Sequence, residues 1–364
     1  MVDNSTQRPA VLEPTGHYSV AWLPDHWYAL CLSRELKARP VTRQLMGQQL
    51  VLFRDGEGRA SALLDRCPHR NVPLSMGRIV NGRLQCAYHG WEFDRRGRCL
   101  QVPGLCGDNR GGGADALYFA AYEQQGIVFV WGRAGAQPDA QPYAVPTVNQ
   151  PGYLSVLEVV EGAASVHAVI ENALDVPHTA FLHRGLFRGS SQRNRIQVRV
   201  TRGADFVQAE YMGEPRPSGL VGWLLAPGGG EVVHFDRFLM PSIAQVEYRL
   251  GEANHILVTA FCTPVEEFRT RIHALVSLRL RLPAVLLRPF ITPLAMHIFA
   301  QDARVLAAQT RAVRSFGGER YASTEIDVLG PQIWRLLRRS QLGRSSPAED
   351  GAELGWVREL EIEV

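Results

Sequence analysis

Short apolar runs separated by turn residues follow one another along most of the chain. In the first third, residues 51–53 and 60–64 are apolar and flank the turn sequence of residues 55–58, a pattern that predicts a β-hairpin. The pattern recurs in four further runs, which we predict to be paired strands: 83–86 with 91–93, and 117–122 with 126–131. These elements indicate a small antiparallel domain that is built only from strands.

Residues 132–142 are rich in Gly, Pro, Ala and Gln, which is typical of a linker, so we place a domain boundary near residue 140. We predict a disordered N-terminus at 1–17, a first domain at 18–140 and a second domain at 141–364. Beyond the linker, runs of strand composition with turn residues between them predict a curved antiparallel sheet. These runs are 153–160, 195–201, 206–212, 232–240, 244–250 and 255–263.

Length and composition agree with two domains, since 364 residues with 46% apolar content can form two hydrophobic cores. A net charge of +3 with mostly scattered basic residues gives no argument for nucleic-acid binding. Six cysteines, of which the four outside the motif described below show no repeated spacing, indicate a reducing compartment. The polar N-terminus lacks an apolar signal segment, so we expect a cytoplasmic protein.

The most apolar stretch, residues 282–300, contains Arg288, His297 and three prolines, which disfavours a membrane span. We predict a buried or interfacial helix there, with a peripheral position at a membrane as the alternative location.

Two short motifs each supply one thiol and one imidazole: Cys67 with His69, and Cys86 with His89. A Cys2His2 set can bind zinc, but zinc modules usually pair Cys with Cys and His with His. Here each half mixes the two ligand types. A two-iron, two-sulfide cluster can divide them so that both thiolates bind one iron and both imidazoles the other. A structural zinc site remains the alternative.

A second group of polar residues follows about a hundred residues later, with Asn172, Asp175, His178 and His183 in the pattern N-x-x-D-x-x-H-x4-H. The spacing places Asp175 and His178 on one face of a helical turn, and Pro177 suggests that the helix is broken or tightened there. Two histidines on neighbouring turns can share a metal ion. The alternative is an ordinary pair of core or surface histidines.

The first motif, C-x-H followed sixteen residues later by C-x-x-H-G-W, resembles the Rieske iron–sulfur motif, and the second resembles the mononuclear iron site of Rieske non-haem iron oxygenases. The resemblance implies an α+β protein: an N-terminal all-β Rieske [2Fe-2S] domain, then a helix-grip (START-like) domain with an antiparallel sheet and a long C-terminal helix. It implies that Cys67, His69, Cys86 and His89 hold the cluster.

The resemblance further implies that a carboxylate in a C-terminal helix joins His178 and His183 in binding mononuclear Fe(II). Asp302 is our choice, because Asp302, Val305, Leu306 and Gln309 form one stripe of a predicted helix. An acidic residue on an apolar face needs a partner, which iron would supply. An ordinary surface aspartate is the alternative.

The family resemblance implies an oxygenase that uses O2 to hydroxylate or oxidatively demethylate a hydrophobic, ring-containing small molecule. The motif F-x-Q-D-x-x-V-L-x-x-Q at residues 299–309 is closer to the monooxygenase, O- or N-demethylase and pheophorbide- or steroid-acting branch. The resemblance assigns Asn172 and Asp175 to the catalytic machinery. It also implies that Asp175 would link a Rieske histidine of one subunit to an iron-binding histidine of its neighbour in a homotrimer.

The chain contains no dinucleotide or flavin fingerprint, so electrons are expected from a separate NAD(P)H-dependent reductase, with or without a ferredoxin. Two other classes of function remain open at the level of sequence. One is a Rieske electron-transfer protein without oxygenase activity, and the other is a lipid-binding helix-grip module. The N-x-x-D-x-x-H-x4-H motif argues against an electron-transfer protein, because such a protein needs no second metal site. The complete Cys/His motif argues against a lipid-binding module.

Overall fold

The computed structural model describes residues 20–105, 113–183, 195–213, 232–251, 254–280, 284–343 and 355–363, without the side chains of 284–292 and 294. The N-terminal segment 1–17, which we predict to be disordered, lies outside the described residues. The described chain divides into two compact units, 22–144 and 145–364.

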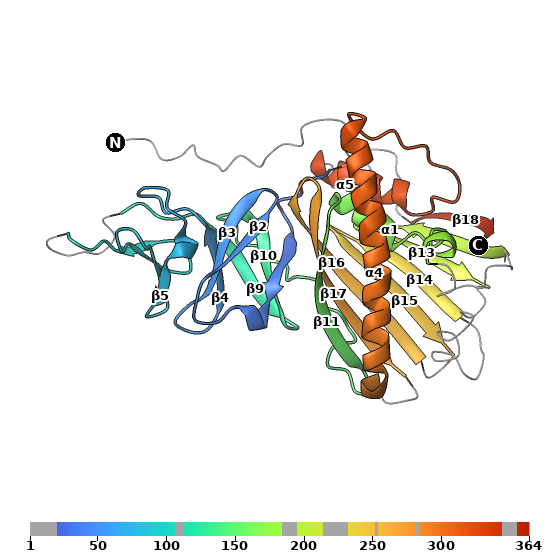
Figure 1. The fold of residues 1–364 in the computed structure, drawn as a ribbon, viewed down its shortest axis with the longest axis horizontal. Helices are drawn as coiled ribbons and strands as arrows, with labels where there is room; N and C mark the ends of the chain where they lie inside the picture. Colours follow the sequence, from blue (N-terminus) through green and yellow to red (C-terminus); the bar gives the residue numbers. More distant parts are fainter. Residues whose placement is uncertain are drawn as a thin grey trace. The chain divides into compact units, whose positions relative to one another are not determined.

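The first unit contains a six-stranded antiparallel sheet and a smaller four-stranded sheet (Figure 1). The large sheet has the order β1-β10-β9-β4-β3-β2. Its strands are β1 (Trp27–Leu32), β2 (Val41–Leu45), β3 (Gln48–Arg54), β4 (Ala60–Leu64), β9 (Tyr118–Gln124) and β10 (Ile127–Ala134). The single-turn 3-10 helices are η1 (Ser33–Glu35) and η2 (Leu74–Met76). Both predicted hairpins, β3 with β4 and β9 with β10, are confirmed.

The four-stranded sheet carries the second Cys/His loop. Its order is β5-β6-β7-β8, with bounds β5 (Arg78–Val80), β6 (Arg83–Gln85), β7 (Glu92–Phe93) and β8 (Cys99–Gln101). The predicted pairing of the strands that flank this loop is confirmed, because β6 pairs with β7. Cys67 and Cys86 belong to the buried core that also contains Phe53, Leu74 and Phe93. Burial in a common core fixes the two loops relative to each other.

The second unit is built on one eight-stranded antiparallel sheet with the order β11-β17-β16-β15-β14-β13-β12-β18. Its strands are β11 (Leu154–Gly162), β12 (Arg195–Arg202), β13 (Phe206–Met212), β14 (Val232–Leu239), β15 (Ile243–Leu250), β16 (Asn254–Glu266), β17 (Arg269–Arg279) and β18 (Trp356–Glu363). In β12, Ile196, Val198 and Val200 are buried and alternate with exposed residues, as expected when one face of a sheet is covered. The predicted antiparallel sheet is confirmed, although β17 and β18 were not predicted.

The long helix α4 (Ala284–Ser315) crosses the sheet, and α1 (Val166–Ala173) and α5 (Gly330–Gln341) lie on the same side of it (Figure 1). This arrangement confirms the predicted α+β class, while α5 was not predicted. The helix expected within 282–300 forms from Ala284, but Met296 and His297 are exposed in this chain. In the described ranges, no helix combines the length and the apolar composition that crossing a membrane requires.

The break expected at Pro177 is present, but the prediction that Asp175 and His178 lie on one face of a helical turn is wrong, because residues 174–178 are not helical. Helix α1 begins after Ser165, whose hydroxyl accepts a hydrogen bond from the Ala168 backbone N–H (3.3 Å), and it ends at Ala173. A one-turn helix, α2 (Thr179–Leu182), follows His178. Asp175 and His178 therefore lie in the connection between two helices, because the residue before a proline avoids the helical region.

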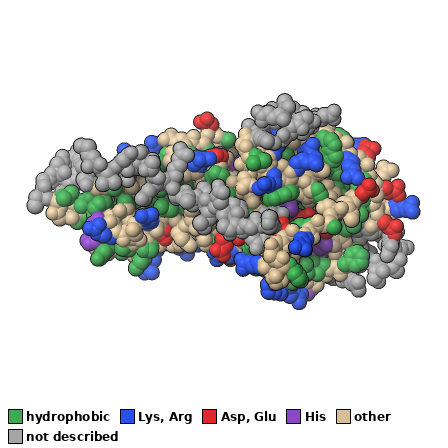
Figure 2. All heavy atoms as spheres, turned by 90° about the horizontal axis from the view of Figure 1, so that it is seen from above, with side chains coloured by type: hydrophobic (Ala, Val, Ile, Leu, Met, Phe, Trp, Pro, Cys, Tyr) green, Lys and Arg blue, Asp and Glu red, His purple; other side chains and the backbone are tan. Residues whose placement is uncertain are grey.

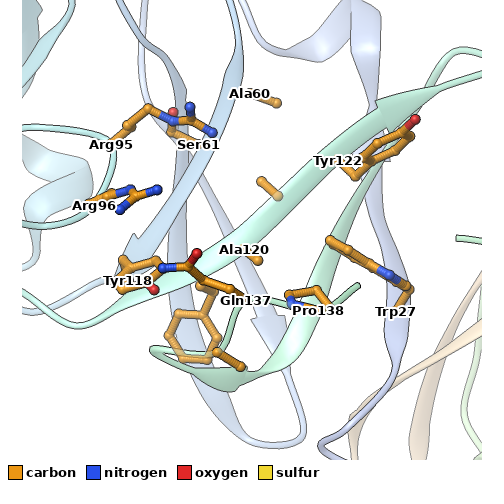
Figure 3. Close-up of a pocket in the computed structure, with 13 residues that line it drawn as sticks. Trp27, Ala60, Ser61, Arg95, Arg96, Tyr118, Ala120, Tyr122, Gln137 and Pro138 are labelled. Atoms are coloured by element: carbon orange, nitrogen blue, oxygen red, sulfur yellow. The ribbon is translucent and has the colours of Figure 1, made fainter. Parts of the chain in front are cut away.

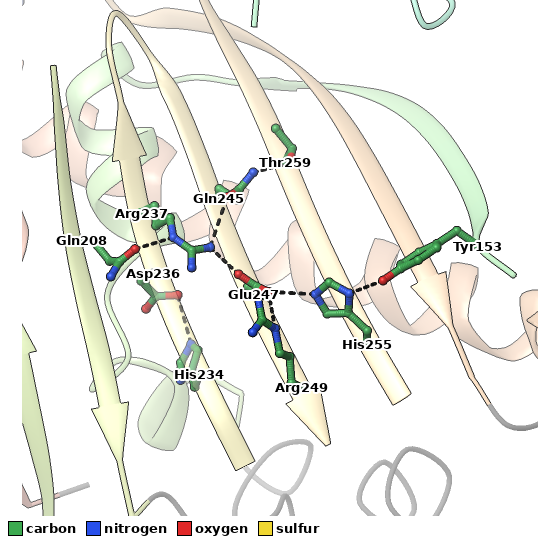
Figure 4. Close-up of polar contacts among 10 residues, drawn as sticks. All are labelled: Tyr153, Gln208, His234, Asp236, Arg237, Gln245, Glu247, Arg249, His255 and Thr259. Carbon is green, nitrogen blue, oxygen red and sulfur yellow. Dashed lines mark hydrogen bonds and ion pairs between the residues drawn. The ribbon is translucent and has the colours of Figure 1, made fainter. Parts of the chain in front are cut away.

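A buried polar network spans strands β13 to β16 (Figure 4). Glu247 lies at its centre and is 4% exposed. Its carboxylate accepts hydrogen bonds from Arg249 Nε (2.7 Å), from His255 Nε2 (2.9 Å) and from Arg237 Nη1. Tyr153 O–H can then donate to His255 Nδ1. Burial alone would raise the pKa of Glu247, but the bonds from His255 and the arginines outweigh it and lower the pKa to about 2.

We predict that Glu247→Gln lowers the free energy of unfolding at pH 7 by roughly 2–3 kcal/mol, since a depressed carboxyl pKa stabilises the folded state. This stabilisation is present above the pKa of an unfolded glutamate, about 4.3, and is lost as the pH falls toward the folded pKa of about 2. The difference in unfolding free energy between wild type and Glu247→Gln should therefore decrease as the pH falls from about 4.3 to about 2. Urea unfolding at a series of pH values measures it.

The matched control is Glu266→Gln, because Glu266 is half-exposed and pairs with Arg269 at the surface (3.2 Å). An exposed pair of this kind contributes about 0–1 kcal/mol. Equal effects of the two substitutions at pH 7 would contradict the role given to Glu247.

Candidate functional site

The two Cys/His loops have the same backbone hydrogen-bond pattern. Cys67 N–H donates to Val72 O (2.9 Å), and Asn71 N–H donates back to Cys67 O (2.9 Å). In the second loop Cys86 N–H donates to Trp91 O (2.8 Å), and Gly90 N–H donates to Cys86 O (3.1 Å). The fourth residue after each cysteine has a positive φ, 59° at Asn71 and 70° at Gly90, which Asn and Gly tolerate best.

These matched loops bring the four predicted ligands together. Cys67 and Cys86 are both buried, and they belong to one core. Burial raises the pKa of Cys67 to about 11, while the backbone N–H groups of His69 and Arg70 favour its thiolate. The ring centroids of His69 and His89 are 4.6 Å apart. The two thiols therefore lie in one core, and the two imidazoles lie next to each other.

The donor set fits a [2Fe-2S] cluster. The His69 Nδ1 atom is buried and has no hydrogen-bond partner in the part of the chain that the structure describes, which leaves its lone pair available for a metal. The Trp91 ring stacks on His69 with 4.7 Å between centroids and an angle of 5°. This contact covers one face of the His69 ring, and the Arg70 backbone N–H can donate to the Cys67 sulfur.

The second candidate centre joins His178, His183 and Asp302. The Nε2 atoms of the two histidines are 3.3 Å apart. Asp302 Oδ1 lies 3.2 Å from His183 Nε2 and 3.5 Å from His178 Nε2. All three potential ligand atoms fall within 4.8 Å of one another. The fold thus brings together three residues that lie up to 124 positions apart in the sequence.

This triangle has the dimensions of one face of a metal ion's coordination shell. Two ligands bound at about 2.1 Å and at right angles are about 3.0 Å apart, close to the three observed separations. Asp302 Oδ1 is buried and, among the described residues, has no hydrogen bond of normal geometry. A buried carboxylate oxygen without such a bond is costly, and a cation between the three side chains would remove the cost.

His178 is held by the connection that precedes it. Its Nδ1 contacts the backbone carbonyl of Asp175 and lies 3.4 Å from the carboxylate Oδ2 of the same residue. Burial lowers the pKa of His178, but the contacts with Asp175 and Asp302 outweigh it and raise the pKa to about 9. The side chains around this imidazole therefore favour a positive charge at this place.

Gln301 is a functional candidate that the sequence reasoning missed. Its Oε1 lies 2.7 Å from His183 Nδ1, on the opposite side of the ring from Asp302. Asn172, in contrast, contacts Asp175 through its backbone carbonyl (3.4 Å). In the described ranges no hydrogen bond connects the Asn172 side chain with the three-residue centre. The sequence signals for Gln301 were its position beside Asp302 and its place in the F-x-Q-D motif of the predicted helix.

Both units match known protein families. Residues 26–107 match the Rieske [2Fe-2S] domain, and residues 163–341 match the vanillate O-demethylase oxygenase C-terminal domain. The chain belongs to the Rieske oxygenases. The Rieske domain implies a [2Fe-2S] cluster, and the oxygenase components of this family use mononuclear non-haem iron.

Individual relatives support this assignment. The vanillate O-demethylase oxygenase subunit of Pseudomonas sp. (strain HR199 / DSM 7063) is 26% identical over 349 residues, which cover 90% of this chain and 96% of the relative. The dicamba O-demethylase oxygenase component of Stenotrophomonas maltophilia is 33% identical over 168 residues, 45% of this chain and 49% of the relative. The chain spans about half the length of several curated relatives that it matches.

A solved structure shows the same fold. Dicamba monooxygenase bound to 3,6-dichlorosalicylic acid matches with a TM-score of 0.75 and 24% identity, covering 90% of this chain and 100% of that one. The Rieske oxygenase fold therefore extends over both units.

The stripe of residues expected to share one apolar face of the C-terminal helix with Asp302 in this Rieske oxygenase is partly wrong. Leu306 is buried, but Val305 is 47% exposed and Gln309 is exposed. The inward positions are Asp302, Leu306 and Val313, which follow spacings of four and seven residues. Asp302 is on the inner side, as predicted, but two of its expected companions are not.

A hollow of about 230 Å³ in the first unit contains none of the predicted site residues (Figure 3). It is bordered by aromatic, basic and amide side chains: Trp27, Arg95, Arg96, Tyr118, Tyr122 and Gln137. On the face that Figure 2 shows, Lys and Arg side chains are scattered among acidic and apolar ones. Neither feature adds residues to the two candidate centres.

Proposed function

We propose that this chain is the terminal oxygenase component of a multicomponent system. It would use O2 and externally supplied electrons to hydroxylate or oxidatively demethylate a hydrophobic, ring-containing small molecule. The single observation that carries the proposal is the triangle of His178, His183 and Asp302, in a chain that also has matched Cys/His loops. An electron-transfer protein without oxygenase activity needs no second metal site.

In this proposal Cys67, His69, Cys86 and His89 hold the cluster, and His178, His183 and Asp302 hold the mononuclear iron. When bound, the two groups would supply single-electron transfer and a site for O2 activation beside the substrate. The protein's own part is to place its three ligands on one side of the ion, so that the other side is left for substrate. The contacts of Asp175 with His178 and of Gln301 with His183 keep both imidazoles turned toward that place.

The names of the relatives support the substrate class and the partners. The oxygenase components named for dicamba and vanillate O-demethylation both align with this chain. A component or subunit of such a system requires a separate supply of electrons, which we assign to an NAD(P)H-dependent reductase, with or without a ferredoxin. The apolar composition of residues 282–300 supports a hydrophobic substrate.

We further propose that the protein forms a homotrimer in which Asp175 links neighbouring chains. The Asp175 side chain is 34% exposed, and one of its oxygens already faces His178. Its second oxygen could therefore accept a hydrogen bond from a histidine of another chain. Asn172, one turn earlier, would support this connection through its backbone carbonyl.

Metal analysis tests the proposed function directly. The reconstituted chain is expected to contain about three irons and two sulfides, and to consume O2 in a substrate-dependent manner with a surrogate reductase and NADH. A panel of hydrophobic aromatic, steroid and alkaloid compounds would identify the substrate class. Assays without substrate, with peroxide quantified, are the control for uncoupled uptake. A fully loaded chain that holds only two irons would exclude the oxygenase function.

A further inference from the structure

The two ring nitrogens of His183 are contacted by two consecutive residues of α4. Gln301 Oε1 lies 2.7 Å from Nδ1, and Asp302 Oδ1 lies 3.2 Å from Nε2. His183 itself is 2% exposed, so water has little access to either nitrogen. Its backbone N–H donates to Thr179 O (3.2 Å) at the end of the single-turn helix α2. The orientation of the ring therefore depends strongly on the helix across from it.

The chemistry of a neutral imidazole decides which hydrogen bond Gln301 can make. A neutral ring has one N–H and one lone pair, and a metal ion uses the lone pair. If the metal lies at Nε2, between His183 and Asp302, Nδ1 must carry the hydrogen and donate it. Gln301 can accept it only when its carbonyl oxygen, and not its NH2 group, faces the ring. The observed placement of Oε1 satisfies this condition.

We propose that Gln301 is a positioning residue that fixes the tautomer and orientation of His183 for metal binding. The proposal rests on the proposed metal site and adds to it a residue that touches no metal. His178 has a different arrangement, with a backbone carbonyl and a carboxylate at its Nδ1. At His183 the acceptor is a neutral amide, which orients the ring without adding a negative charge. Loss of such an outer partner typically weakens metal affinity by about 10- to 100-fold.

The test uses the full-length chain with its cluster intact and measures the dissociation constant for Co²⁺ at the iron-free mononuclear site by chelator competition. Gln301→Met keeps the length of the side chain but removes the acceptor, so we expect Co²⁺ to bind about 10- to 100-fold more weakly. Gln301→Glu keeps an acceptor and should bind Co²⁺ at least as tightly as wild type. Gln309→Met is the matched control, because Gln309 is exposed on the same helix, and its affinity should be unchanged.

Two results separate failure of this inference from failure of the proposed function. If wild type binds Co²⁺ in an Asp302-dependent manner and Gln301→Met binds it equally tightly, Gln301 has no positioning role. If wild type shows no Asp302-dependent binding, the metal site itself is wrong. Should Gln301→Met fail to retain the cluster spectrum, Gln301→Asn replaces it, because the shorter amide cannot span the same distance and the same loss of affinity is expected.

Discussion

Asp302→Ala is expected to reduce the iron content from about three to about two per chain and to abolish turnover, while the visible spectrum of the cluster stays unchanged. The reason is that Asp302 supplies one corner of the three-residue triangle, whereas it belongs to a different unit from the four Cys/His ligands. Iron and sulfide analysis, the absorption spectrum and substrate oxidation measured on one preparation check all parts of this result.

Val305→Ala provides the matched control for Asp302→Ala, because Val305 is exposed on the same helix and only three residues away. It should retain three irons and wild-type turnover. If Asp302→Ala also retained the third iron and full activity, Asp302 would have to be removed from the site.

Two inactive variants are expected to restore activity to each other if Asp175 connects neighbouring chains. Cys86→Ala loses a proposed cluster ligand, and Asp302→Ala loses a proposed ligand of the mononuclear site, so each chain keeps the centre that the other lacks. In a head-to-tail trimer that contains both variants, one of the three junctions joins two intact centres. Turnover of about one third of wild type is therefore expected. Co-expression with two affinity tags and tandem purification would provide the mixed oligomers.

Adding Asp175→Ala to both chains should remove this recovered activity, because Asp175 would no longer connect the chains. Mixed oligomers with verified metal content that show no turnover above the separate variants would argue against a subunit-crossing arrangement. Asp175 would then be a residue that only orients His178, with which it is already in contact.

The sequence predicted those parts of the fold in which the interacting residues are close along the chain. The hairpins β3–β4 and β9–β10 were visible because apolar runs flank short turns. Strand β17 was missed because Arg269, Arg271 and His273 weaken its apolar pattern, although its register with β16 continues over most of its length. Most residues of strand β18 are exposed, and the strand pairs with β12, more than 150 residues away in the chain.

The residues of the candidate centres also divide into those whose neighbours are close along the chain and those brought together over long distances in the sequence. The spacing of Cys67 with His69 and of Cys86 with His89 was visible in the sequence, because each pair lies in one short loop whose backbone pattern depends on local residues such as Asn71. Asp302 was selected only through a family resemblance. The stripe offered in its support was wrong at Val305 and Gln309, since a helical period alone does not tell which side faces the protein.

The sequence by itself determined the two Cys/His loops, the break at Pro177 between His178 and the preceding helix, and the strands that short turns connect, because each depends on residues within a few positions of one another. Only the tertiary structure decided that Asp302 completes the triangle and that Gln301 holds the far side of His183. Both contacts bridge more than a hundred residues, and they exist because α4 packs across the sheet and places one helical turn beside the α1–α2 connection. No local pattern contains that information, since the energy that fixes the helix comes from burial against the whole domain.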